Sequence, residues 1–173
     1  MMDITIHLLD ESVKEELFEF EVENRNYFAQ IGFPRDKSYY DFRNFEQITK
    51  DLIFDREKDL TYLYLIKNSF GKIVGRVNLF SITRGPFNKA EIGYRIGENH
   101  QGKGYATKAV KLAVKNALDV HRFHRLEAGT SPENIGSQIV LIKNGFQFTG
   151  RQSKFIYNNG KWNDSISFEK ILD

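Results

Sequence analysis

The position of one glycine-rich segment is the strongest constraint on how this chain folds. Residues 97–104, GENHQGKG, lie between a strand-like pattern and a helix-like pattern. They nearly match two nucleotide-binding motifs. However, Gly104 replaces the Ser or Thr that ligates magnesium in a P-loop, and Thr107 replaces the third glycine of the dinucleotide fingerprint. A dinucleotide-binding fold also places its glycine loop directly after the first strand. The patterns that precede residue 97 therefore decide between the possible folds.

One strand and two helices are predicted at the start of the chain. Ile4, Ile6 and Leu8 alternate with polar residues, as in a half-buried strand. Ser12 and Glu15 fit a capping box at the start of a helix. A second helical pattern follows Pro34. The apolar positions are Val13, Leu17 and Phe20 in the first helix, and Phe42, Phe45, Thr49, Leu52 and Ile53 in the second.

Three strands separate these helices from the glycine-rich segment. Residues 61–68 and 72–82 flank a Ser-Phe-Gly turn and are predicted to form a hairpin. Residues 89–96 form the next strand, which leads directly into the loop. The loop thus follows the fourth strand, not the first, and this order argues against both nucleotide-binding motifs.

Beyond the loop, predicted helices and strands alternate, and the chain then ends in a hairpin. A stripe of small residues predicts a helix that lies close against a sheet; its members are Ala106, Ala109, Val110, Ala113 and Ala117. Residues 125–130 form a short strand, Asn134 caps a further helix, and Gly145 suits the left-handed position after its end. Residues 145–157 and 161–172 form a long hairpin around an Asn-Gly turn.

The predicted order, β-α-α-β-β-β-α-β-α-β-β, defines a single α+β domain (an α/β sandwich) over residues 1–173. We expect a central, mostly antiparallel mixed sheet of about seven strands, flanked by about four helices. A chain of this length suits one domain with a substantial core.

Composition excludes several classes of function. A net charge of +2 without basic runs gives no expectation of direct nucleic-acid binding. No cysteine is present, and the four histidines lack zinc-ligand spacing, so no metal site is expected. The first residues lack the pattern of a signal peptide, and no apolar stretch reaches membrane-spanning length. The expected location is the cytoplasm, with no membrane partner.

A glycine turn that leads into a helix N-terminus can hold an anion. The first N–H groups of a helix lack intrahelical partners, and the helix dipole places partial positive charge there. Gly102 and Gly104 let the backbone approach a phosphate closely, and Lys103 and Lys108 add positive charge nearby. From the residues alone, a plain turn that begins a helix explains the segment equally well.

Two motifs together resemble one known family. Gln101-x-x-Gly104-x-Ala106, between a fourth strand and a helix, resembles the acetyl-CoA pyrophosphate loop of the GCN5-related N-acetyltransferases (the GNAT family). Residues 134–150, NIGSQIVLIKNGFQFTG, resemble the second cofactor segment of that family. The motif GYRIGENHQGKGYATKAV, with ENR at 23–25 and NGKWND near the end, is similar to the RimJ/RimL-like branch, which acetylates N-terminal amines of ribosomal proteins.

The resemblance implies acetyl-CoA as the cofactor and a nearly end-to-end match of the fold. It implies that pantetheine lies along residues 94–96 and that the adenine diphosphate end lies on residues 101–106. The cofactor-binding residues expected on this basis are Tyr94, Arg95, Ile96, Gln101, Gly102, Lys103, Gly104, Tyr105, Ala106, Asn134 and Lys143. Asn134 has a second explanation, since it also caps its helix, and Lys143 is also a surface residue near the cofactor.

The resemblance also suggests a base and an acid. Glu91 matches the strand position from which the histone-acetylating branch draws its general base, but a solvated or ion-paired strand residue is the alternative. Many relatives carry a tyrosine as general acid where this chain has Leu141, which cannot donate a proton. Ser137 is the substitute that the ribosomal-protein branch suggests; a serine that bonds only to its own helix or to cofactor is the alternative.

The acceptor is expected to be a primary amine, and the family branch favours the N-terminal α-amine of a ribosomal protein. The aromatic stretch 24–42 lies where this fold shapes its acceptor pocket, and Tyr27, Tyr39, Tyr40 and Trp162 are the expected substrate-binding residues. Core packing explains Trp162 equally well. A small amine such as a polyamine, amino acid, dipeptide or aminoglycoside is the alternative acceptor, and a non-catalytic acyl-CoA sensor is the alternative from another class. A monomer and a homodimer both remain open.

Overall fold

The computed structural model describes residues 3–32 and 34–173 of the chain. Residue 33, within the aromatic stretch, and residues 1–2 lie outside the described part. No helix within that part is long and apolar enough to cross a membrane. The five α-helices are α1 (Lys14–Glu23), α2 (Arg25–Ile31), α3 (Phe42–Glu57), α4 (Tyr105–Asp119) and α5 (Ile135–Lys143). The seven strands are β1 (Ile4–Leu8), β2 (Tyr62–Asn68), β3 (Ile73–Thr83), β4 (Lys89–Ile96), β5 (Arg125–Thr130), β6 (Gln147–Asn158) and β7 (Lys161–Ile171).

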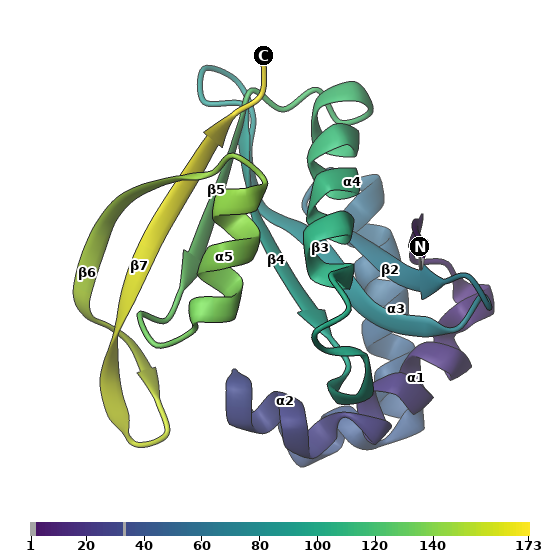
Figure 1. The fold of residues 1–173 in the computed structure, drawn as a ribbon. Helices are drawn as coiled ribbons and strands as arrows, with labels where there is room; N and C mark the ends of the chain where they lie inside the picture. Colours follow the sequence, from purple (N-terminus) through teal and green to yellow (C-terminus); the bar gives the residue numbers. More distant parts are fainter. Residues whose placement is uncertain (1–2, 33) are drawn as a thin grey trace.

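The strands form one mixed sheet between two layers of helices. Their order is β1-β2-β3-β4-β5-β7-β6, and among the described strands only β4 and β5 pair in parallel. Helices α4 and α5 lie on one face, and α1 to α3 lie on the other (Figure 1). This arrangement confirms the predicted α+β class and the mostly antiparallel sheet.

The small residues of α4 let this helix pack closely against the sheet. Ala109, Val110, Ala113 and Ala117 are fully buried in the core that α4 shares with β1 to β5. Small side chains bring a helix axis near a sheet, and close packing makes dispersion contacts effective. Ala106, predicted for the same stripe, is only partly buried, because it lies at the open end of the helix.

The first helix begins differently from the prediction. Asp10, not Ser12, provides the cap, because its carboxylate accepts hydrogen bonds from the backbone N–H (2.7 Å) and the hydroxyl of Ser12. A short 3₁₀ turn, Glu11–Val13, then precedes α1. The charged carboxylate of Asp10 thus accepts the N–H of Ser12, which the side chain of Glu15 would accept in a capping box.

A helix that the sequence patterns did not predict lies between the two predicted ones. Helix α1 ends at Glu23, and α2 begins at Arg25. Between them lies Asn24, whose side-chain Nδ2 donates to the carbonyl of Phe20 (2.9 Å). The seven residues of α2 bury only Phe28 fully. So short a helix shows little periodicity, and its stability depends on contacts made by the folded chain.

The parallel pairing of β4 with β5 is short. It covers Lys89–Arg125, Ala90–Leu126 and Glu91–Glu127 and then stops. Strand β4 continues to Ile96 along β3, while β5 continues to Thr130 along β7. The two halves of the sheet therefore separate, and the opening faces α2 and the start of α4 (Figure 1).

One buried ion pair joins α1 to the sheet. Glu21 on α1 is fully buried, and its Oε1 lies 2.8 Å from Nη1 of the buried Arg76 on β3. The other oxygen, Oε2, has no hydrogen-bond partner within the described residues. Removing one partner of such a pair leaves an uncompensated buried charge, which costs far more than losing a surface pair.

We expect Glu21→Gln to lower the free energy of unfolding by about 3–5 kcal/mol, because Arg76 then stays buried without a counter-charge. Urea denaturation at neutral pH measures this change. Glu46→Gln is the matched control, since Glu46 pairs with Lys14 at a partly exposed site; a much smaller loss is expected there. Equal losses in the two variants would contradict the assignment.

Candidate functional site

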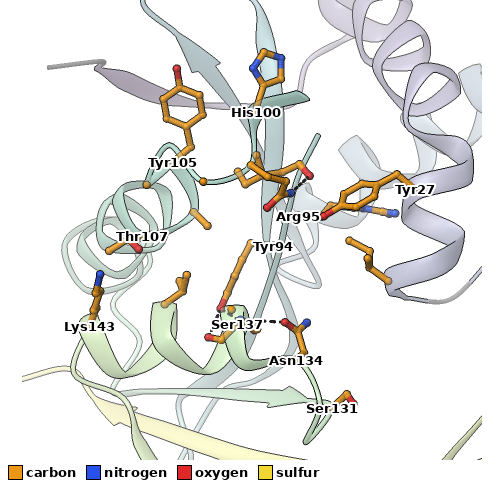
Figure 2. Close-up of a pocket in the computed structure, with 18 of the residues that line it drawn as sticks. Tyr27, Tyr94, Arg95, His100, Tyr105, Thr107, Ser131, Asn134, Ser137 and Lys143 are labelled. Atoms are coloured by element: carbon orange, nitrogen blue, oxygen red, sulfur yellow. Dashed lines mark hydrogen bonds between the residues drawn. The ribbon is translucent and has the colours of Figure 1, made fainter. Parts of the chain in front are cut away.

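The opening between β4 and β5 continues into a groove of about 760 Å³. Its lining comes from α2, the end of β4, the glycine-rich loop, the start of α4, and α5 with the turn before it. In Figure 2, Thr107 and Lys143 lie at the α4 side, Tyr27 and Arg95 lie at the α2 side, and Tyr94 and Ser137 lie between them. The groove therefore joins a helix N-terminus to the separated strands.

The helix entrance at α4 has the geometry of an anion site. Gly102 and Gly104 have positive φ angles of 73° and 75°, and a β-carbon on either would meet no atom within 4 Å. Gly104 is the N-cap and offers no side chain to cap the helix. Partial positive charge at the helix N-terminus and an unobstructed backbone together suit a phosphate group.

The loop before α4 is anchored to α1 and β4. Asn24 Oδ1 accepts the backbone N–H of Glu98 at 2.8 Å, and Gln101 Nε2 donates to the carbonyl of Ile96 at 2.6 Å. A β-carbon on Gly97 would lie 3.0 Å from the Phe20 ring and 3.1 Å from Asn24 Oδ1. A side chain at this position would force the Phe20 ring or Asn24 to shift, so glycine suits the close approach of the loop to α1.

A hydroxyl pair occupies the middle of the groove. The hydroxyl of Tyr94 lies 3.0 Å from Oγ of Ser137 and 3.1 Å from the Ser137 carbonyl oxygen, to which it donates. Burial raises the pKa of Tyr94 to about 12, with a smaller lowering by the bond with Ser137. The hydroxyl is therefore protonated at neutral pH. Asn134 Oδ1 accepts the backbone N–H of Ser137 at 3.1 Å, which confirms the predicted helix cap.

Arg95 contributes positive charge at the α2 end. Its guanidinium lies 4.7 Å from the centre of the Phe28 ring, and it is directly opposite Arg76 on the neighbouring strand. Burial, and then the charge of Arg76, lower the pKa of Arg95 to about 10, so the group is still cationic at neutral pH. Burial likewise lowers the pKa of His100, at the other side of the loop.

Most of the residues singled out from the sequence line this groove. They are Tyr27, Tyr94, Arg95, Ile96, Gln101, Gly102, Gly104, Tyr105, Ala106, Asn134, Ser137 and Lys143. Their functional roles stay predictions. The fold nevertheless brings together residues from α2, from the end of β4, from the glycine loop with the start of α4, and from α5 with its cap.

Five of the predicted site residues lie elsewhere. Lys103 points away and donates from Nζ to the carbonyl of Asn99 (3.1 Å). Tyr39 is buried in the core beneath α3, and Tyr40 stacks under Arg25. Trp162 is exposed and contacts Tyr157 on the terminal hairpin.

Glu91 lies where the pairing of β4 with β5 ends, opposite Glu127. It alternates with Ala90 and Ile92, which are buried against α4, so its side chain lies on the other face of the sheet. Leu141 is fully buried in the core, so this position packs the helix and does not face the groove.

Several groove residues were not identified from the sequence. They are Gln30, Ile31, His100, Thr107, Ser131, Glu133, Gly136 and Val140. His100 lies inside the glycine-rich segment and Thr107 follows it closely, so proximity in sequence could have indicated them. Gln30 and Ile31 lie within the aromatic stretch 24–42 but were not singled out, because helix α2, which carries them, was not predicted.

The comparison with known protein families agrees with this architecture. Residues 7–147 match the acetyltransferase (GNAT) domain, which is more than half of the chain. The chain belongs to this family, and it is an acetyl-CoA-dependent N-acetyltransferase of the GNAT type. Membership confirms the predicted family and cofactor, and it favours an enzyme over a non-catalytic sensor.

Several known acetyltransferases are similar to this chain in sequence or in structure. The probable N-acetyltransferase YjcK of Bacillus subtilis is 36% identical over 93% of this chain and 90% of its own length. The ribosomal-protein-S5-alanine acetyltransferase of Vibrio fischeri has a TM-score of 0.92 at 27% identity, covering 98% of this chain and 93% of its own. RimL, a ribosomal L7/L12 α-N-protein acetyltransferase solved with coenzyme A, shares the fold with a TM-score of 0.88 at 20% identity, covering 98% and 94%.

We expect Asn24→Ala to loosen the start of the glycine loop, because the Glu98 N–H loses its buried acceptor. The free energy of unfolding should fall by about 1–3 kcal/mol, and amide exchange at Glu98 should become faster. Asn44→Ala is the matched control: its side chain also donates to a backbone carbonyl, that of Ser38 (2.9 Å), but it is exposed. A change of about 0.5 kcal/mol or less is expected there. Unaltered exchange at Glu98 in Asn24→Ala would show that this bond does not hold the loop.

Proposed function

We propose that this enzyme transfers an acetyl group from acetyl-CoA to the N-terminal α-amine of a protein, with a ribosomal protein as the acceptor class. One observation carries the proposal: a single groove extends from the N-terminus of α4, past the end of β4, to residues of α2. A cofactor can occupy one half of such a groove while an extended peptide end enters from the other. Transfer then takes place where the two halves meet.

The cofactor is assigned to the α4 half. Its diphosphate fits the helix entrance at residues 101–106, where Gly102 and Gly104 present backbone without side chains. The pantetheine arm is amide-rich and suits the edge of β4 at residues 94–96, which has no paired strand on the β5 side. Lys143 adds a cation at the same end. Lys103 serves this site only if it leaves its bond to the Asn99 carbonyl.

The reaction is assigned as a direct transfer in a ternary complex. The amine nitrogen attacks the thioester carbonyl, the C–S bond breaks, and the coenzyme thiolate leaves. The chain has no cysteine to carry an acetyl-enzyme. Backbone N–H groups of β4 near the thioester supply the charge stabilisation that an oxyanion needs.

Ser137 is the proposed proton donor to the departing thiolate, with Tyr94 as its hydrogen-bonded neighbour. Because a thiolate with a pKa of about 8.5 leaves readily, this donor need not be strong. Glu91 is the proposed base. It is not among the residues that line the groove, so it acts through a water between it and the amine. An α-amine titrates near ~8, so part of it is neutral without any base.

The acceptor class rests on the relatives and on the groove. The solved structure with the higher identity of the two above is named as acting on alanine of ribosomal protein S5. The groove extends beyond the half assigned to the cofactor as far as α2, which leaves room for the end of a peptide chain. A small amine is the second candidate, and a panel of N-terminal peptides and small amines, with acetyl-CoA consumption as the measurement, separates the two.

We expect Gly104→Ala to weaken coenzyme A binding by about tenfold or more, because its β-carbon enters the space of the diphosphate. Calorimetric titration measures the affinity. Gly71→Ala is a matched control in the β2–β3 turn: its φ is 77°, close to the 75° of Gly104, and a β-carbon on either glycine meets nothing within 4 Å. Both variants should lose about 1 kcal/mol of stability, but only Gly104→Ala should lose affinity. Wild-type affinity in Gly104→Ala would contradict the assigned diphosphate site.

We expect Ser137→Ala to lower kcat by about tenfold or more on a peptide acceptor without a comparable change in coenzyme A affinity.

Glu91→Gln should lower kcat at pH 7. The kcat of this variant should recover as the pH rises past the α-amine pKa of ~8, since the amine is then neutral without a base. Steady-state pH profiles measure both effects. Unchanged turnover in both variants would remove these two residues from the mechanism.

A further inference from the structure

The acceptor half of the groove contains a cation that forms no ion pair with any carboxylate of the described residues. Arg95 is only partly buried and lines the groove beside α2. Within residues 3–32 and 34–173 its guanidinium makes a ring contact with Phe28 at 4.7 Å, and no hydrogen bond or ion pair is found for it. An arginine has five N–H donors in a planar fork that matches a carboxylate, so most of this capacity is unused.

The surrounding charges leave Arg95 with an excess of positive charge. The one buried carboxylate nearby, Glu21, is bound to Arg76 through Oε1 and attracts Arg95 without forming an ion pair with it; it is completely inaccessible to a ligand in the groove. Arg35 and Arg25 lie over the rings of Tyr39 and Tyr40 on the same side of the sheet. Like charges directly opposite on neighbouring strands, as in Arg76 and Arg95, are unfavourable unless a negative group compensates them.

The groove itself supplies little negative charge at this end. Among the described residues that line the groove, Glu133 alone carries a carboxylate. Its side chain is exposed and accepts a hydrogen bond from Ser131. Lys143 lies at the opposite, α4 side, next to the half assigned to the cofactor (Figure 2). The charge of Arg95 is therefore available to the acceptor and not to the diphosphate.

We propose that Arg95 selects acceptors that carry a carboxylate close to the reactive amine. This inference rests on the proposed function and names the substrate class of the same groove. Two sources supply that chemistry: an acidic side chain within the first few residues of a peptide, or the α-carboxylate of a free amino acid. A polyamine brings only positive charge and is repelled.

The test compares amidated peptides that differ in one side chain. Ala-led peptides with Glu, Gln or Lys at the second, third or fourth position are assayed with acetyl-CoA, alongside alanine, alaninamide and spermidine. The kcat/KM with the preferred Glu peptide should exceed that of its Gln counterpart by about tenfold or more, the size expected for a charge-assisted hydrogen bond. The Lys peptide should be poorer still. A preference for alanine over alaninamide without any peptide preference would assign the carboxylate to a free amino acid.

Variants then test whether Arg95 causes the preference for the Glu peptide. Arg95→Gln should reduce the Glu-to-Gln ratio to about one, mainly through KM, and Arg95→Lys should restore part of it. Arg95→Glu should favour the Lys peptide. Arg35→Gln is the control, because this exposed arginine lies in the same positive region but outside the groove; its ratio should stay close to that of the wild type. Coenzyme A affinity is measured in each variant by calorimetry, so that a disturbed cofactor site is detected separately.

Binding of the peptides to the coenzyme A-loaded enzyme gives a readout that does not require turnover. Equal binding and equal kcat/KM for the Glu and Gln peptides overturn the inference while leaving peptide acetylation intact. A preference that Arg95→Gln leaves unchanged also overturns it. If no peptide is acetylated but alanine is, and Arg95→Gln abolishes this, the proposed function fails and the inference stands. Spermidine as the preferred acceptor contradicts both.

Discussion

The early end of pairing between β4 and β5 is the constraint on which the site depends. After Glu91 and Glu127 the two strands follow different neighbours, so the sheet opens without losing its other ladders. The exposed edge of β4 lies beside the N-terminus of α4, and Tyr94 extends from that edge to Ser137 on α5. A continuous sheet would have filled this space with strand pairing. Its interruption leaves backbone hydrogen-bonding groups and a helix entrance facing the same groove, which suits a ligand that carries both amides and phosphates.

Charge is distributed so that the two halves of the groove differ. The α4 half depends on the helix dipole and on backbone that no β-carbon obstructs. The α2 half depends on arginine, and the buried Glu21 forms its ion pair with Arg76, not with Arg95. An ion pair of this kind contributes little net stability compared with apolar packing. It does, however, hold Arg76 in place opposite Arg95 and so maintains positive charge at this end of the groove.

The sequence predicted the architecture better than the details of its N-terminal third. The small-residue stripe of α4, the Asn134 cap and the Asn-Gly hairpin each have a local cause, and each is present in the structure. The start of α1 was predicted at Ser12, but Asp10 competes for the same N–H. Helix α2 was missed because seven residues carry too little periodicity to be recognised. The site followed the same division: the glycine loop and residues 134–143 were found, while Gln30, Ile31 and the place of Glu91 on the far face were not.

By itself, the sequence determined the order of the strands, the glycine turn before α4 and, through the resemblance of two motifs, the family to which the chain belongs. The strands and the turn follow from short-range physics, since glycine conformations, helix caps and strand alternation depend on residues only a few positions apart. Only the tertiary structure decided which side chains share the groove. Asn24 reaches the loop at Glu98 across 74 positions of the chain, and Arg95 meets Arg76 through strand register. Such contacts depend on how layers pack against one another, and no local pattern of residues encodes that packing.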